Sequence, residues 1–146
     1  MATPYFAYAS NMSRVEMFLR CPGAGLVNEA VLPDHRFRIN RGGVATVAPE
    51  PDAQVHGVLW MITDEDERAL DRYEEVAEGL YAKARQRVRV RVGPVEALED
   101  VEALIYVARD ETRGVPRAGY LEQVIACAEA HGLPPEYVAE IRAWRP

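Results

Sequence analysis

The sequence predicts an α+β fold in which a mixed, barrel-like β-sheet forms the core and helices flank it. Strand-like segments fill most of the chain between residues 26 and 61, while helical patterns interrupt and close the chain. Strands and helices do not alternate as regular βαβ winding requires, so a curled sheet with outer helices fits better. The 146 residues are a usual length for one domain, and no repeat divides them. We therefore expect residues 1–146 to form a single domain.

Composition and charge narrow the class of protein. With 49% hydrophobic and 27% charged residues, the chain can bury a core and does not have the composition of a disordered protein. The net charge of −6 disfavours binding to nucleic acid or to an anionic membrane. No apolar run could span a bilayer, and a strand-like segment begins too early for a signal peptide. The two cysteines form no spaced cluster, which indicates reduced thiols in a cytoplasmic protein.

The N-terminal part predicts a strand followed by a helix. Tyr5–Tyr8 is aromatic and apolar, as in a strand. Ser13 and Glu16 then have the spacing of a capping box, which starts a helix. Cys21-Pro22-Gly23 ends that helix, since proline and glycine disfavour its continuation. Three apolar residues share one helical face: Val15, Phe18 and Leu19.

Strands are predicted next. Leu26–Leu32 and His35–Ile39 are separated by Pro33-Asp34, a pair that favours a turn. Val44–Val47 and Val55–Met61 follow as two further strands.

Glycines occur before the first of these later strands and inside the second. Gly42-Gly43 precedes Val44–Val47, and Gly57 lies inside Val55–Met61. A glycine inside a strand indicates a bulge or the close approach of another backbone.

The middle of the chain predicts one helix and a strand pair. Thr63 suits an N-cap and an acidic first turn follows it, so a helix should run to about Tyr73. Alternating valine and arginine over 87–92 indicates a half-buried strand with a solvated arginine face. Val101–Ala108 can pair with that strand across the Gly93-Pro94 loop.

Two helices close the chain. Gly132 stops the first, and Pro134-Pro135 opens the short second one. The apolar face of the first is formed by Leu121, Val124, Ile125 and Ala128.

The sequence gives no support for a metal site, a serine or cysteine nucleophile, or a phosphate-binding loop. Of the three histidines, His35, His56 and His131, only His131 has another ligand-type residue at helical spacing on a predicted helix, Cys127, and one such pair is too few ligands, so no metal site is expected. The Gly-x-Ser-x-Gly nucleophile elbow and the Gly-x-x-x-x-Gly-Lys phosphate loop are both absent. Cys21 precedes a proline and has no evident basic partner, so we do not expect it to act as a nucleophile.

The segment Tyr5–Asn11 is the first candidate site. Here a strand runs into a helix start, where unpaired backbone N–H groups and the helix dipole favour an anion. Ser10 and Asn11 add side-chain donors. A ligand that carries a carboxylate would fit such a place.

The segment Asp71–Tyr81 is the second candidate site. Glu74 lies in it with Tyr73 and Tyr81. A carboxylate walled by aromatic rings loses hydration, which raises its pKa from about 4.3 and makes it a better base. An acidic, solvated loop is the alternative interpretation.

Five segments, spread in order over nearly the whole chain, match the pattern of one protein family. They are Tyr5–Asn11 (Tyr-Phe-Ala-Tyr-Gly-Ser-Asn in the family), Gly42–Val47 (Gly-Gly-Ile-Ala-Thr-Ile), Val55–Trp60 (Val-x-Gly-Val-Val-Trp), Leu70–Tyr81, which carries the catalytic glutamate, and Tyr120 with His131–Tyr137. In these segments the chain resembles the γ-glutamylcyclotransferase family.

The resemblance implies a mixed β-barrel flanked by helices and a small-molecule γ-glutamyl substrate. In the implied reaction the substrate's α-amine attacks its own γ-carbonyl and releases 5-oxoproline and a free amine or amino acid. It implies no metal and no organic cofactor. Glu74 is the implied catalytic residue, a general acid and base. The implied substrate-binding residues are Tyr5, Phe6, Ala7, Tyr8, Ala9, Ser10, Asn11, Tyr81 and Tyr120.

Two positions depart from the family pattern. Ala9 replaces a glycine, which costs on the order of 1 kcal/mol if the loop needs φ > 0 there. If the glycine instead allows close approach of the ligand, the added methyl group narrows the pocket. Glu75 replaces the glycine after the catalytic glutamate and offers a rival carboxylate, although register favours Glu74. Its charge could also raise the pKa of Glu74.

Other functions stay open at this point. One is removal of a γ-glutamyl protecting group from a larger biosynthetic intermediate. Another is a noncatalytic member that binds a small carboxylate or a protein partner. The exposed strands leave room for a homodimer, although nothing requires one.

Overall fold

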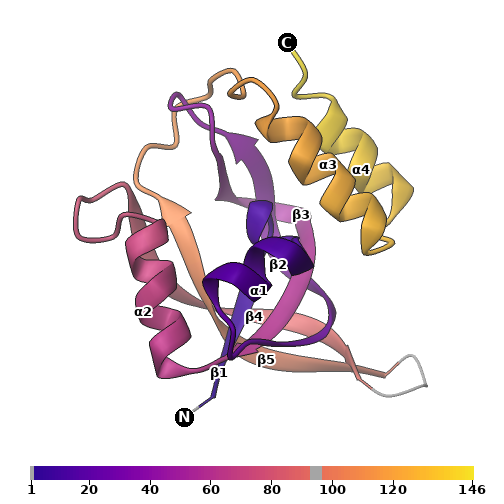
Figure 1. Ribbon diagram of the computed structural model, residues 1–146. Coiled ribbons are helices and arrows are strands. Elements are labelled where there is room, and N and C mark those ends of the chain that lie inside the picture. Colours follow the sequence, from indigo (N-terminus) through magenta and orange to yellow (C-terminus); the bar gives the residue numbers. More distant parts are fainter. Residues whose placement is uncertain (1, 93–96) are drawn as a thin grey trace.

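The computed structural model describes residues 2–92 and 97–146, and a closed β-barrel lies at its centre (Figure 1). The strand order is β1-β3-β2-β4-β5. The strands are β1 (Thr3–Ala7), β2 (Gly25–Ile39), β3 (Ala45–Ile62), β4 (Tyr81–Val92) and β5 (Ala97–Ala108). This confirms the predicted α+β class with a mixed, barrel-like sheet. The predicted Gly93-Pro94 loop between β4 and β5 lies outside the described residues.

The short strand β1 closes the barrel. Along one edge it pairs antiparallel with β3, where Phe6 lies opposite Leu59. Along the other edge it runs parallel to β5, where Tyr5 lies opposite Leu104. All four of these side chains are buried. The parallel pair makes the sheet mixed and fixes the end of β1, from which the candidate loop continues.

Gly57 of β3 allows β1 to come close. A Cβ atom at this position would overlap the carbonyl oxygen of Ala7 and lie 2.9 Å from Cζ of Phe6. The close backbone approach predicted from this interior glycine is confirmed.

Strands β2 and β3 form one long ribbon, so the prediction of four shorter strands is wrong. Pairing continues past Pro33-Asp34, with His35 opposite Pro49. Asp34 takes a positive φ of 57°, and its Oδ1 accepts a hydrogen bond from the N–H of Asp52 at 3.0 Å. The pair therefore produces a local irregularity within the ribbon instead of a chain reversal, because the strand on each side of it stays paired with β3.

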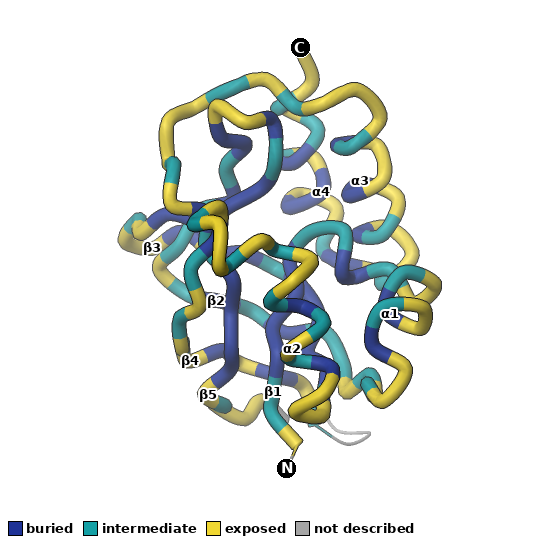
Figure 2. The backbone as a smooth tube through the Cα atoms, turned by 60° about the vertical axis from the view of Figure 1, so that its left-hand side comes forward, coloured by how far each residue is buried: buried dark blue, intermediate teal, exposed yellow. Residues whose placement is uncertain are grey.

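The helices flank the barrel, with α3 and α4 packed side by side against one part of it (Figure 1). They are η1 (Ser10–Met12, a 3₁₀ turn), α1 (Arg14–Arg20), α2 (Asp64–Tyr73), α3 (Tyr120–Ala130) and α4 (Pro135–Arg142). The apolar face predicted for α3 is buried, as expected. Buried positions are concentrated in the strands and on the inward sides of the helices (Figure 2). In the described part of the chain, no helix has the length and apolar character needed to cross a membrane.

Helix α1 has the predicted cap but an unexpected orientation. Ser13 accepts a hydrogen bond from the N–H of Glu16, as a capping residue should. Met17 is the side chain that α1 buries. The apolar face recognised in the sequence points outward instead: Val15 is 69% exposed, Phe18 73% and Leu19 74%.

Candidate active site

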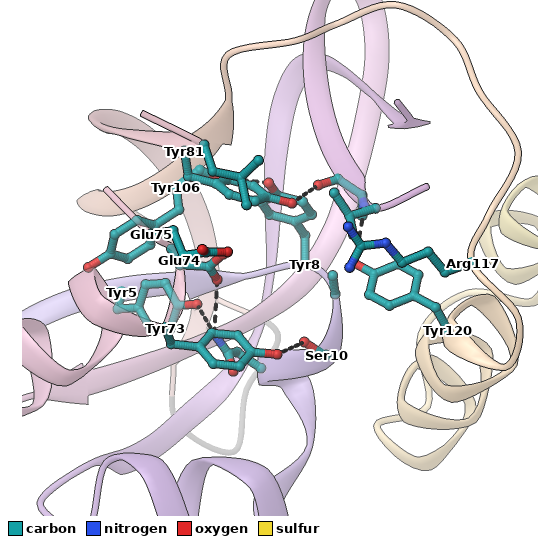
Figure 3. A pocket seen from close by; sticks show the side chains of 15 residues that line it. Tyr5, Tyr8, Ser10, Tyr73, Glu74, Glu75, Tyr81, Tyr106, Arg117 and Tyr120 are labelled. Carbon is teal, nitrogen blue, oxygen red and sulfur yellow. Dashed lines mark hydrogen bonds between the residues drawn. The ribbon is translucent and has the colours of Figure 1, made fainter. Parts of the chain in front are cut away.

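An open cavity of about 250 Å³ lies where the end of β1, the loop after α2 and the segment before α3 meet (Figure 3). These three parts are far apart in the sequence. The predicted site residues that line the cavity are Tyr5, Tyr8, Ala9, Ser10, Asn11, Glu74, Tyr81 and Tyr120. The fold thus brings both candidate segments to one place.

Glu74 reaches the cavity from the C-terminal end of α2. A capping box between Thr63 and Asp66 starts this helix. The buried Leu70 anchors its last turn, and the Leu70 carbonyl accepts a hydrogen bond from the Glu74 N–H at 2.8 Å. Burial raises the pKa of the Glu74 carboxyl to about 7, while the positive charge of Arg20 opposes that rise. Glu74 therefore has the position and the proton affinity of a base that works near neutral pH.

Asn11 connects Glu74 to the opposite wall. Its Nδ2 donates to the hydroxyl of Tyr5 at 3.0 Å and to Oε1 of Glu74 at 3.4 Å. From behind, Nη1 of Arg20 donates to Oδ1 of Asn11. Because a guanidinium can only donate, this contact sets the amide with its nitrogen toward Glu74. The guanidinium carbon also lies 3.4 Å from the ring centroid of Tyr73, which holds Arg20 in place.

Tyrosine side chains with anchored hydroxyls line the cavity from its upper part in Figure 3, where Tyr81 lies, round to its right side, where Tyr120 lies. The hydroxyl of Tyr8 donates to the carbonyl of Tyr106 at 2.6 Å, and that of Tyr81 donates to the carbonyl of Ala45 at 2.6 Å. The hydroxyl of Tyr120 accepts from the Ala45 N–H at 3.1 Å. Burial raises the pKa of Tyr8, Tyr81 and Tyr120. These hydroxyls stay protonated at neutral pH, so the wall is fixed and uncharged.

Side chains from distant elements hold the turn η1. Nε1 of Trp60 donates to the Asn11 carbonyl at 3.1 Å. The His131 Nε2 lies 2.6 Å from the Met12 carbonyl and must carry the proton there, because a carbonyl can only accept. The first backbone N–H groups of η1, at Ser10 and Asn11, have no acceptor within that turn, and both residues line the cavity. Ser10 also contacts the site through its Oγ, which lies 3.3 Å from the Tyr73 hydroxyl.

The two departures from the family pattern have different structural consequences. Ala9 has φ −136°, so the left-handed conformation considered for this position does not occur, and alanine is not penalised for it. The Ala9 methyl group does belong to the cavity lining. Glu75 has φ +51°, in the left-handed region that favours glycine. The glycine of the family pattern at this position thus has a backbone cause.

Phe6 and Ala7, which were also expected to bind the substrate, are not among the described residues that line the cavity. Both are buried at the end of β1, with exposed fractions of 0% and 1%. They lie beneath Gly57 of β3 and support the barrel. Phe6 lies on the opposite face of β1 from Tyr5, because side chains alternate along a strand.

Several cavity residues were missed by the sequence analysis as ligand contacts. They include Tyr73, Tyr106 and Arg117. Tyr73 stands in the acidic segment beside Glu74, which is a usable signal. Tyr106 is one residue of an alternating strand, and Arg117 precedes α3 in a segment without a motif. The sequence near these two residues therefore did not indicate that they line a cavity.

A family model described as the AIG2-like family matches residues 54–141, more than half of the chain. The chain belongs to the AIG2-like family. Among curated relatives of this AIG2-like protein, the γ-glutamylcyclotransferase of Mus musculus is 28% identical over 97% of this chain and 78% of the relative. The γ-glutamylcyclotransferase of Homo sapiens is 27% identical with the same coverage.

Solved structures agree with this assignment. One of a γ-glutamyl cyclotransferase superposes on the AIG2-like chain with a TM-score of 0.88 and 26% identity, covering 100% of this chain and 89% of the other. The predicted family resemblance is confirmed, as is membership of a family of enzymes.

Proposed function

We propose that this protein cleaves γ-glutamyl amides by intramolecular cyclisation and releases 5-oxoproline and an amine. The observation that carries the proposal is the partly buried carboxyl group of Glu74, with a pKa of about 7, in a cavity that is also lined by the start of η1. The γ-glutamylcyclotransferase relatives support the same reaction.

The proton affinity of Glu74 suits this chemistry. The substrate's α-ammonium has no free electron pair and must lose a proton before it can attack. An α-amino group has a pKa of about 8, close to the value of about 7 for Glu74, so the transfer between them costs little. Glu74 thus accepts a proton from the ammonium and is left as a neutral acid.

The ring then closes and the amide breaks. The amine nitrogen forms a bond to the γ-carbonyl carbon, and the carbonyl electron pair moves onto oxygen. Glu74 donates its proton to the leaving nitrogen as that carbon–nitrogen bond breaks and the carbonyl re-forms. The surplus proton of the new ring nitrogen returns through Glu74 to the released amine. No net charge or proton is gained or lost.

The cavity supplies orientation more than reactivity. Attack within one molecule is fast when the substrate is held folded, with the amine against the γ-carbonyl. In our proposal, the N–H groups of Ser10 and Asn11 bind the glutamyl α-carboxylate or the developing oxyanion. A volume of about 250 Å³ is at the small end of ligand pockets. It favours a single γ-glutamyl amino acid or amine over a large intermediate.

Product analysis tests the proposal. The protein is incubated with a panel of γ-glutamyl amino acids and amines, and 5-oxoproline is measured by mass spectrometry. Glu74→Gln is isosteric and cannot accept the proton, so we expect turnover to fall about 100-fold or more. Glu75→Gln removes the rival carboxylate, which is exposed, and should leave most of the turnover.

Two results would contradict the proposal. Absence of 5-oxoproline across the whole panel, with folded protein, would exclude the reaction. Equal turnover by wild type and Glu74→Gln would exclude Glu74 as the base.

A further inference from the structure

Arg117 enters the cavity from the side opposite Glu74 and Glu75 (Figure 3). Among the cavity residues in the described part of the chain, it provides the positive charge, whereas Glu74 and Glu75 provide negative charge. The cavity is therefore electrically polarised from one end to the other. A substrate with a carboxylate at its leaving end would match this arrangement.

We propose that Arg117 selects γ-glutamyl amides whose leaving amine carries a carboxylate, by pairing with that carboxylate. This inference rests on the function proposed above. In this inference Arg117 is a specificity-determining residue. The preferred class of substrate is then a γ-glutamyl amino acid, not a γ-glutamyl amine.

The base of the Arg117 side chain is held by the loop before β3. The Arg117 N–H donates to the Gly43 carbonyl at 3.0 Å, and its Nε donates to the Gly42 carbonyl at 2.9 Å. Gly43 has φ +82°, and a Cβ there would lie only 2.8 Å from Cγ of Arg117. Gly43 thus leaves the space in which the arginine stem lies.

The terminal nitrogens of Arg117 are left for a ligand. Within residues 2–92 and 97–146, no carboxylate lies at ion-pair distance from this guanidinium, and the side chain is exposed at the cavity mouth. The two contacts to Gly42 and Gly43 use the backbone and Nε, so both Nη groups keep their donors. A guanidinium that presents two parallel donors matches a carboxylate in two-point geometry.

The reaction geometry decides which substrate carboxylate Arg117 meets. The glutamyl α-carboxylate shares a carbon with the α-amine, and that amine must lie beside Glu74. The leaving amine is attached to the carbonyl carbon and extends away from the glutamyl end. Its carboxylate therefore points toward the opposite side of the cavity, where Arg117 lies beside Tyr120 (Figure 3).

The test compares two substrates that differ only in the carboxylate: γ-glutamyl-L-alanine and γ-glutamyl-ethylamide. We expect kcat/KM of the wild type to be about 10-fold higher for the first, as one charge-assisted contact at an open mouth allows. Arg117→Gln should remove that preference by lowering kcat/KM for the alanine compound about 10-fold, mainly through KM. Arg117→Lys, which keeps the charge, should restore part of it. Arg87→Gln on the exposed face of β4 makes the same charge change away from the cavity and should alter neither value.

The outcomes separate this inference from the proposed function. Equal wild-type kcat/KM for both compounds, or an equal loss for both in Arg117→Gln, would overturn the role of Arg117 while leaving the cyclisation intact. Turnover of γ-glutamyl amines in the panel above, but not of γ-glutamyl-L-alanine, would also overturn the role of Arg117. Failure of the wild type to release 5-oxoproline from these two compounds and from the whole panel would instead overturn the proposed function.

Discussion

The Nδ2 of Asn11 lies 3.4 Å from Oε1 of Glu74, and this contact joins the two candidate segments of the chain. It is aimed by Arg20, which occupies the other end of the Asn11 amide. Glu74 thus has one side-chain donor and lies under the influence of one cation. The proposed base is partly withdrawn from water, but its ionised form is not left without a partner.

Activity should depend on pH through Glu74. Its pKa of about 7 means that the carboxylate needed to accept the substrate proton is progressively lost below neutrality. We expect kcat/KM to fall about 10-fold per pH unit on the acid side of a midpoint near 7. Initial rates of 5-oxoproline release between pH 5 and 8, at about constant ionic strength, measure this midpoint. A rate that stays nearly level down to about pH 5, as an ordinary glutamate pKa of 4.5 would give, would show that the pKa of Glu74 is not raised in the folded protein.

The raised pKa of Glu74 should also lower the free energy of unfolding at high pH. In the unfolded chain Glu74 ionises near 4.5, whereas in the folded protein it keeps its proton up to about 7. The folded state therefore binds more protons between these values, and its stability falls as pH rises through them. The penalty is absent below 4.5 and complete above 7, where it amounts to about 3 kcal/mol.

Glu74→Gln should expose this penalty in urea unfolding. The variant should be about as stable as wild type at pH 4 and more stable by up to about 3 kcal/mol at pH 8. Glu78→Gln, on an exposed residue of the same segment, is the control and should show no such trend. A stability difference that does not change with pH would contradict the raised pKa.

Arg20 should act on the reaction through Asn11 and Glu74 without touching substrate. Arg20→Met removes the donor to Asn11 and the charge that lowers the Glu74 pKa. We expect kcat to fall about 10-fold and the acid midpoint of the pH profile to move upward. Arg20→Lys keeps a charge but cannot lie flat on Tyr73 while reaching Asn11, so it should restore the midpoint better than kcat.

Arg14→Met is the matched control for Arg20, because Arg14 is an exposed arginine on the same helix. It should leave both the rate and the midpoint unchanged. Loss of activity in Arg20→Met with an unmoved midpoint would mean that Arg20 acts only by supporting the fold.

Glu75 should be a site of backbone strain. Its φ of +51° is unfavourable for any residue with a Cβ atom. Glu75→Gly and Glu75→Ala both remove the charge, but only glycine relieves the conformation. We expect Glu75→Gly to be more stable than Glu75→Ala by about 1 kcal/mol in urea unfolding at pH 7. Equal stabilities would show that the strain is compensated locally.

The sequence predicted the parts of the site that depend on local chemistry. The Thr63 cap, the end of α2 and the aromatic neighbours of Glu74 follow from residues within one helical length. The contact of Arg20 with Tyr73 and the placement of Arg117 over Gly43 depend on pairing between distant elements, which no local pattern encodes. The same limit explains the β2 error, because Pro33-Asp34 has the composition of a turn and only its partner strand makes it a bulge.

Helix α1 shows that a sequence pattern also leaves the orientation of a helix undetermined. Its apolar spacing was correctly recognised, but periodicity identifies a face without telling which way that face points. Met17 and Arg20 are directed inward because one fills the core and the other reaches Asn11.

His131 should position η1 from a distance of more than a hundred residues in the sequence. Its Nε2–H donates to the Met12 carbonyl at 2.6 Å, next to Ser10 and Asn11, whose N–H groups we propose bind the substrate. His131→Ala leaves that carbonyl without its donor and should cost about 1 kcal/mol of unfolding free energy. Because η1 is then less constrained, kcat/KM should fall several-fold, roughly 5-fold, beyond what the loss of folded protein explains. His131→Gln, which keeps a side-chain N–H, should recover part of both losses. If His131→Ala lowers stability but leaves kcat/KM of the folded protein unchanged, the contact supports the packing of α3 and does not position the site.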